Sequence, residues 1–124
     1  MNYNLFLDNI KIGFSDLENA DPPMGVVSGK IKWNQKNLDY IFLSTYCKIN
    51  SIQTEEYPEE KFISTQTIPK LKIYNENGIE IEGVGSYIEG MDSEGFEINI
   101  IGIPYPFYEQ EFPNHVEEYK KSLE

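Results

Sequence analysis

The amino-acid sequence predicts an α+β domain, in which an antiparallel sheet of about six or seven strands is packed by two helices, the second at the C-terminus. Three observations lead to this fold class. Short segments of alternating apolar and polar residues recur along the chain, as in half-buried strands. Two other segments place apolar residues three and four positions apart, as along one side of a helix. Glycine, proline and asparagine separate these segments and favour turns between them.

The first three predicted strands lie near the N-terminus. Residues 3–7 and 10–14 alternate in polarity and predict two strands joined by a tight turn at Asp8-Asn9. Residues 15–24 are polar and contain two consecutive prolines, which predicts a stiff loop because proline continues neither a helix nor a central strand. Residues 27–33 alternate again and predict the third strand.

A change of period after residue 37 predicts the first helix, with Asn37 as its N-cap. Six residues share one helical stripe, which we expect to be buried: Leu38, Ile41, Phe42, Thr45, Tyr46 and Ile49. Tyr40, Leu43 and Cys47 lie on the opposite side, so the helix could be covered on both sides. The high content of Tyr, Ile, Phe and Thr would also suit a strand.

The second half of the chain contains five more candidate strand segments, at residues 62–66, 71–74, 79–82, 84–88 and 96–101, of which the first could be too short to count as a separate strand. Asn77-Gly78, between the second and third of these, is the strongest hairpin signal in the sequence. A loop at residues 90–95 is expected to join the last two strands into another hairpin.

The C-terminal segment predicts the second helix. Pro104 and Pro106 are expected to end the sheet. Four apolar residues then follow at helical spacing: Phe112, Val116, Tyr119 and Leu123. Pro113 stands where a proline in the first turn is tolerated. With 124 residues, the chain is expected to form a single domain, residues 1–124.

The charge balance excludes several classes of partner. Twenty-one acidic residues outnumber ten basic ones, for a net charge of -11, and every basic residue is Lys. Nucleic-acid binding is therefore not expected, because it depends on a basic surface and usually on Arg. No apolar run is long enough to cross a membrane and no signal peptide is recognised, so we expect a cytoplasmic protein without a membrane partner.

Residues that could carry chemistry are few. Cys47 is the only cysteine and His115 the only histidine, and both are expected to be structural. Gly83-Val84-Gly85 lacks the third glycine of a dinucleotide loop, and the acids around Gly95 lack the spacing of an EF-hand calcium loop. We therefore predict no catalytic, cofactor-binding or metal-binding residue, and a protein that is not an enzyme.

Acidic segments provide the candidate binding residues. Residues 53–61 read as an exposed loop with four carboxylates around an aromatic ring, and an acidic surface of this kind attracts a basic protein. A second acidic patch precedes the two prolines. Together they give the predicted partner-binding residues Glu55, Glu56, Tyr57, Glu59, Glu60, Asp16, Glu18 and Asp21.

Two stretches resemble a known class of proteins. The residues are Asp21-Pro22-Pro23-Met24-Gly25-Val26, and Gly102-Ile103-Pro104-Tyr105-Pro106 through Phe112-Pro113-Asn114-His115-Val116. They are similar to segments of small bacterial immunity proteins from contact-dependent inhibition and polymorphic toxin systems. The resemblance implies a cytoplasmic antidote that binds one toxin domain, and it transfers no binding residue. In physical terms the two stretches read as a loop and a sheet-to-helix junction, so they could reflect shared packing.

Three functional hypotheses follow from the sequence. The first is an immunity protein that neutralises a basic toxin domain, for instance a nuclease, by occluding it. The second is a non-catalytic interaction module, such as a homodimer joined through sheet edges or a Tyr-rich surface. The third is a small-molecule binder or enzyme, which a deep pocket holding His115 or two buried carboxylates would favour.

Overall fold

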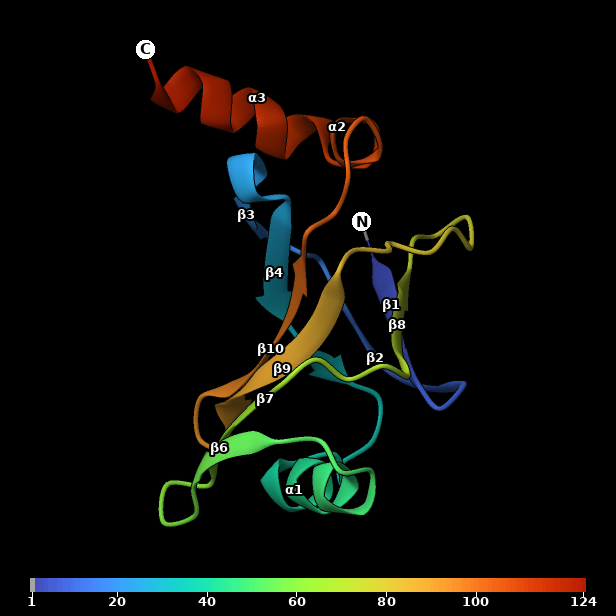
Figure 1. Ribbon diagram of the computed structural model, residues 1–124, viewed down its shortest axis with the longest axis vertical. Helices are drawn as coiled ribbons and strands as arrows, with labels where there is room; N and C mark the ends of the chain where they lie inside the picture. The colour runs from blue at the N-terminus through green and yellow to red at the C-terminus, as the bar shows by residue number, and fades with distance from the viewer. Residues whose placement is uncertain (1) are drawn as a thin grey trace.

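The computed structural model describes residues 2–124 and contains two antiparallel sheets and three α-helices, the last at the C-terminus (Figure 1). The α+β class is therefore confirmed. The predicted strands are divided between two sheets, and a short additional helix precedes the C-terminal one. The four-stranded sheet has the order β5-β2-β1-β8, and the six-stranded sheet has the order β3-β4-β10-β9-β7-β6.

Most strands form where the alternating pattern predicts them. The strands of the four-stranded sheet are β1 (Tyr3–Leu7), β2 (Ile10–Ser15), β5 (Lys32–Trp33) and β8 (Leu71–Tyr74). The strands of the six-stranded sheet are β3 (Asn19–Asp21), β4 (Val26–Lys30), β6 (Thr54–Tyr57), β7 (Phe62–Thr65), β9 (Gly85–Met91) and β10 (Gly95–Ile101). The predicted turn at Asp8-Asn9 is confirmed: both residues have positive φ, which matches the right-handed twist of a tight hairpin.

Four details of the strand prediction were wrong. The segment 27–33 is divided between the two sheets, and the chain changes sheet at buried Ile31. The predicted loop at 15–24 contains β3 and a 3-10 turn, η1 (Pro22–Met24). The predicted loop at 53–61 contains β6. Residues 79–82 form one bridge with β8, between Tyr74 and Glu80, instead of a full strand.

The helices are α1 (Tyr40–Ile49), α2 (Phe107–Glu111) and α3 (Pro113–Ser122). Helix α1 begins two residues later than predicted, because Asp39 and not Asn37 is the N-cap: the Asp39 carboxylate accepts a hydrogen bond from the Phe42 amide at 3.0 Å. The predicted buried stripe is confirmed only in part: Leu38 is buried and Phe42 and Tyr46 pack against the core, but Ile41, Thr45 and Ile49 are exposed. The buried residues of α1 are Tyr40, Leu43, Ser44 and Cys47. The proline at the start of α3 is confirmed.

One hydrophobic core lies between the two sheets and joins side chains from both, including Leu5, Ile73, Ile88 and Ile98. Helix α1 lies at one end of the molecule, and α2 and α3 lie at the other (Figure 1). Alternate residues of the six-stranded sheet point into the core, and the residues between them are exposed or half-buried. The sheet therefore has one face turned away from the core.

Candidate functional site

The predicted acidic loop is an edge strand followed by a turn, and this changes the direction of its side chains. Successive residues of a strand point to opposite faces of the sheet. Glu55 and Tyr57 are exposed on β6, whereas Glu56 is half-buried and points toward α1. Glu59 and Glu60 are exposed in the turn that leads to β7. Of the five residues predicted here, Glu56 alone is not exposed, because its side chain contacts α1.

Glu56 accepts three hydrogen bonds from hydroxyl groups. The donors are Tyr40 at 2.7 Å and Ser44 at 2.8 Å, both on α1, and Thr54 at 2.5 Å on the same strand. Burial alone would raise the pKa of Glu56, but the three donors, helped by Lys48, lower it. The hydrogen bonds of this carboxylate therefore link α1 to β6 at the edge of the sheet.

Removing this carboxylate should produce a pH-dependent loss of stability. Because the folded-state pKa of Glu56 is lowered, its contribution is present above the unfolded-state pKa of about 4.3 and is lost as the pH falls through the folded-state value. We expect Glu56→Gln to lower the free energy of unfolding at pH 7 by about 1 kcal/mol, the low end for a hydrogen-bonded charge because the group is partly exposed. Urea unfolding at pH 7 and pH 3 would measure this difference, which should be smaller at pH 3.

A Ser44→Ala background provides the control for this prediction. The variant lacks one of the three donors, so Glu56→Gln should cost less there at pH 7. A cost of Glu56→Gln that is equal at both pH values would contradict the role given to the carboxylate.

Cys47 and His115 are not brought together. Cys47 is fully buried in α1, and His115 lies in α3 at the opposite end of the molecule (Figure 1). Burial, together with the charge of Glu56, raises the pKa of the Cys47 thiol to about 11, so a reactive thiolate is not favoured at neutral pH. His115 is half-buried as predicted, and its Nε2 lies 2.7 Å from the Leu17 carbonyl oxygen.

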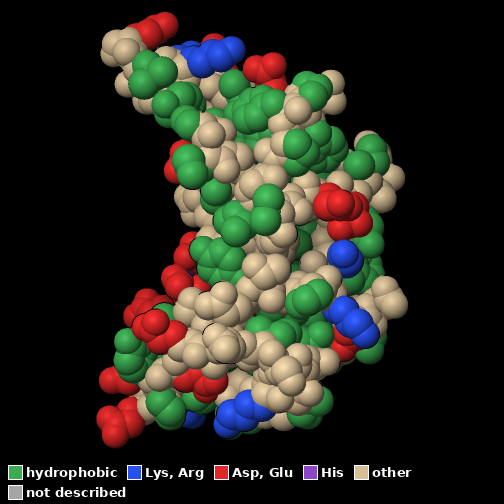
Figure 2. Space-filling model, in the orientation of Figure 1, with side chains coloured by type: hydrophobic (Ala, Val, Ile, Leu, Met, Phe, Trp, Pro, Cys, Tyr) green, Lys and Arg blue, Asp and Glu red, His purple; other side chains and the backbone are tan. Residues whose placement is uncertain are grey.

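The face of the six-stranded sheet turned away from the core carries a row of acidic residues. The strand register places Glu55 on β6 opposite Ser64 on β7, and Ser64 opposite Glu89 on β9. Glu89 is in turn opposite Glu97 on β10. In Figure 2 the molecule is hollowed on this side, between the C-terminal helix and the β6–β7 turn, and acidic side chains gather along the lower part of the hollow.

Glu89 and Glu97 form a like-charge pair, and such pairs are destabilising when directly opposite. Within residues 2–124, no ion pair neutralises either carboxylate. Lys30 is opposite Glu97 on β4, but its ammonium donates a hydrogen bond to the Glu94 carbonyl at 3.0 Å. Ser64 donates to Glu89 at 2.9 Å, which holds that carboxylate over the sheet. Burial and the two neighbouring carboxylates raise the pKa of Tyr87.

Aromatic and apolar side chains border the acidic row. Tyr57 is opposite Phe62, and Phe62 is opposite Met91 in the next strand. The rings of Tyr57 and Phe62 pack with their centroids 5.5 Å apart, and Tyr57 is 53% exposed. Its hydroxyl donates to Glu55 at 2.9 Å. We define the acidic sheet face as Glu55, Tyr57, Phe62, Ser64, Glu89, Met91 and Glu97.

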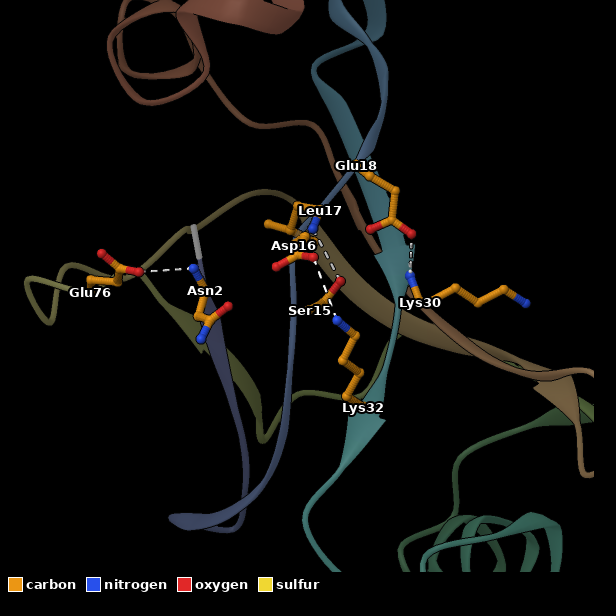
Figure 3. A network of polar contacts seen from close by, with 8 residues as sticks. All are labelled: Asn2, Ser15, Asp16, Leu17, Glu18, Lys30, Lys32 and Glu76. Atoms are coloured by element: carbon orange, nitrogen blue, oxygen red, sulfur yellow. Dashed lines mark hydrogen bonds and ion pairs between the residues drawn. The ribbon is translucent and has the colours of Figure 1, made fainter.

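Two members of the second predicted patch have structural contacts (Figure 3). Glu18 accepts a hydrogen bond from the Lys30 backbone amide at 2.9 Å. Asp16 lies 3.7 Å from the Lys32 ammonium in an exposed ion pair, which contributes little stability. Asp21 is exposed at the end of β3. These three residues do not form a single acidic surface with β6.

A small cavity of about 210 Å³ contains the groups that the small-molecule hypothesis required, including Asp16, Glu18, Glu111 and His115. The Glu111 carboxylate is already bound on both oxygens, by the Tyr3 hydroxyl and the Asn75 amide, each at 2.9 Å. His115 contacts the Leu17 carbonyl. Because Glu111 and His115 are each engaged in structural contacts, the cavity does not favour a catalytic interpretation. A larger depression, about 600 Å³ beside α1, is lined by no carboxylate, histidine or cysteine.

Comparison with known proteins gives no further assignment. No family model, curated protein or solved structure matches the chain significantly. Residues 2–124 contain no cluster of His, Cys, Asp or Glu that could hold a metal ion. They also form no helix that is both long and apolar enough to cross a membrane.

Of the residues predicted for binding, Glu55 and Tyr57 lie on the acidic sheet face, whereas Glu89 and Glu97 were not predicted as binding residues. The sequence contains part of the evidence for this face, because the alternation of residues 96–101 places Glu97 on the polar side of a strand. The position of Glu89 opposite Glu97 depends on the hairpin register, which the broadly predicted loop at 90–95 did not define.

Proposed function

We propose that this chain is a non-catalytic immunity-type inhibitor that binds a basic protein, such as a nuclease toxin domain, through the acidic sheet face. The observation that carries the proposal is the opposed, unneutralised pair Glu89 and Glu97, on a row that continues through Ser64 to Glu55. Within residues 2–124, Lys30 is the one cation in this row and its ammonium is bound to the Glu94 carbonyl, so a basic partner would supply the charge that pairs with the two carboxylates.

The rest of the surface is consistent with this role. A net charge of -11 accelerates the approach of a cationic protein and makes the association rate sensitive to salt. Exposed Tyr57, packed against Phe62, offers an aromatic anchor beside the carboxylates, of the kind that often dominates an interface. Nuclease active sites hold phosphates with Lys and Arg, so a rigid array of carboxylates can occupy them by imitating that charge.

Co-expression is the direct test of this proposal. If the gene lies beside that of a large toxin, producing the toxin's C-terminal domain in bacteria should stop growth, and producing this chain with it should restore growth. The purified proteins should also form a complex whose association slows as salt is raised. Growth arrest that persists when this chain is well expressed would contradict an immunity function.

A further inference from the structure

Helix α1 carries an exposed apolar ridge that the fold leaves uncovered. Ile41 and Ile49 are 62% and 76% exposed, and Thr45 between them is also exposed. The three residues are spaced four apart, so they form one continuous row along the helix. We call this row the α1 ridge. In Figure 1, α1 lies at the lower end of the molecule with no other element beyond it.

The opposite side of α1 is fully used by the fold. Leu43 and Cys47 are completely buried, and Tyr40 and Ser44 bind Glu56. Helices with apolar residues all round are usually covered on all sides. The ridge also continues into a hollow of about 270 Å³, whose apolar wall includes Leu38, Phe42 and Tyr46 and, across from α1, exposed Ile10.

The ridge is symmetric about its centre, which determines what can cover it. In an antiparallel pairing with a second copy about Thr45, Ile41 of each chain would meet Ile49 of the other. The small Thr45 side chains would meet at the axis and let the two helices approach closely. An isologous interface requires this kind of self-complementary surface.

Charge is also self-complementary along α1. In this antiparallel pairing, Lys48 of each copy lies near the N-terminal end of the other helix, where Asp39 is the N-cap. The two helix dipoles are then antiparallel, which is favourable. Within α1 itself, Lys48 is the only charged residue, although the chain as a whole has a net charge of -11. Copies of such a chain repel each other least where negative charge is scarce.

From the symmetry and charge of this ridge we propose that the protein self-associates as a two-fold dimer through the α1 ridge. The proposal goes beyond the proposed function, because the acidic sheet face is a separate surface and stays open in the dimer. The interface is small, so we expect a weak dimer with a dissociation constant on the order of 10–100 µM. Higher salt should strengthen it by screening the repulsion between two acidic chains, whereas salt should weaken binding to a basic partner.

Sedimentation equilibrium of the full chain at low and high salt tests the proposal. We expect Ile49→Lys to weaken dimerisation at least about tenfold, because the substitution acts twice in a two-fold interface. Val84→Lys is the matched control: Val84 is 82% exposed and distant from α1, so the dimer should be unchanged. A wild-type chain that stays monomeric at several hundred micromolar and high salt, or a dimer weakened equally by both variants, would overturn the proposal.

A thiol at the centre of the ridge gives an independent measurement. Thr45→Cys places two cysteines at the axis, so mild oxidation should crosslink a dimer readily. Ser93→Cys, in the exposed β9–β10 turn, is the control, and native Cys47 is fully buried. Crosslinking of Thr45→Cys no faster than that of Ser93→Cys would place the contact elsewhere and reject the two-fold arrangement.

Discussion

Replacing Tyr108 by Ala is expected to lower the free energy of unfolding by about 3–5 kcal/mol, the range for removing a large buried aromatic side chain. Tyr108 is completely buried in α2. Its ring stacks on Tyr105 at 5.2 Å between centroids and contacts Phe112 at 5.4 Å. Its hydroxyl donates to the Val26 carbonyl at 2.8 Å, and burial raises the pKa of that hydroxyl well above its usual value.

The expected loss is large because Tyr108 joins the C-terminal helices to the sheet. Around it, the Tyr105 hydroxyl donates to the Pro22 carbonyl at 3.0 Å, and the Ile103 amide donates to the Gly25 carbonyl at 2.9 Å. Residues 21–26 and 102–116 therefore contact each other and form one packing unit.

Denaturant unfolding of Tyr108→Ala and Tyr108→Phe would separate packing from hydrogen bonding. The Phe variant keeps the ring and leaves only the Val26 carbonyl without its donor, so we expect a smaller loss of about 1–3 kcal/mol. If Tyr108→Ala cost less than about 1 kcal/mol, the C-terminal helices would not be packed as described.

The elements predicted correctly from the sequence are those determined by local pattern. Strands β1, β2, β9 and β10 alternate clearly and are joined by short connections, so neighbouring residues define them. Strand β6 was missed because Thr-Glu-Glu-Tyr has no apolar alternation. It forms through pairing with β7 and through the hydroxyl contacts of Glu56, both of which are tertiary. Helix α2 is five residues long and depends on the burial of Tyr108.

The buried side of α1 could not be decided from sequence because both sides are apolar. The stripe from Leu38 to Ile49 is the longer pattern, but the chain buries Leu43 and Cys47. What decides between the two sides is the contact of Tyr40 and Ser44 with Glu56, which lies on a distant strand. The candidate site could not be predicted from the sequence for a similar reason, since only the register of β9 with β10 places Glu89 opposite Glu97.

Charge reversal at Glu89 is expected to change binding and stability in opposite directions. Glu89→Lys removes the repulsion with Glu97 and places an opposite charge beside it, so we expect the fold to gain about 0.2–1 kcal/mol. The same change puts a cation on the acidic sheet face, which should slow association with a basic toxin domain by about tenfold or more. Thermal unfolding and stopped-flow association at low salt would measure the two effects.

Glu118→Lys on α3 is the matched control, since it changes the net charge equally at an exposed position away from the face. Association rates within about twofold for the two variants would mean that the interface lies elsewhere, even if the stability gain appeared. A gain in stability together with slower association would be informative, because substituting a residue with only a structural role would reduce both stability and binding. Two directly opposed carboxylates repel each other in the isolated fold, and under the proposed function a basic partner would turn this repulsion into attraction.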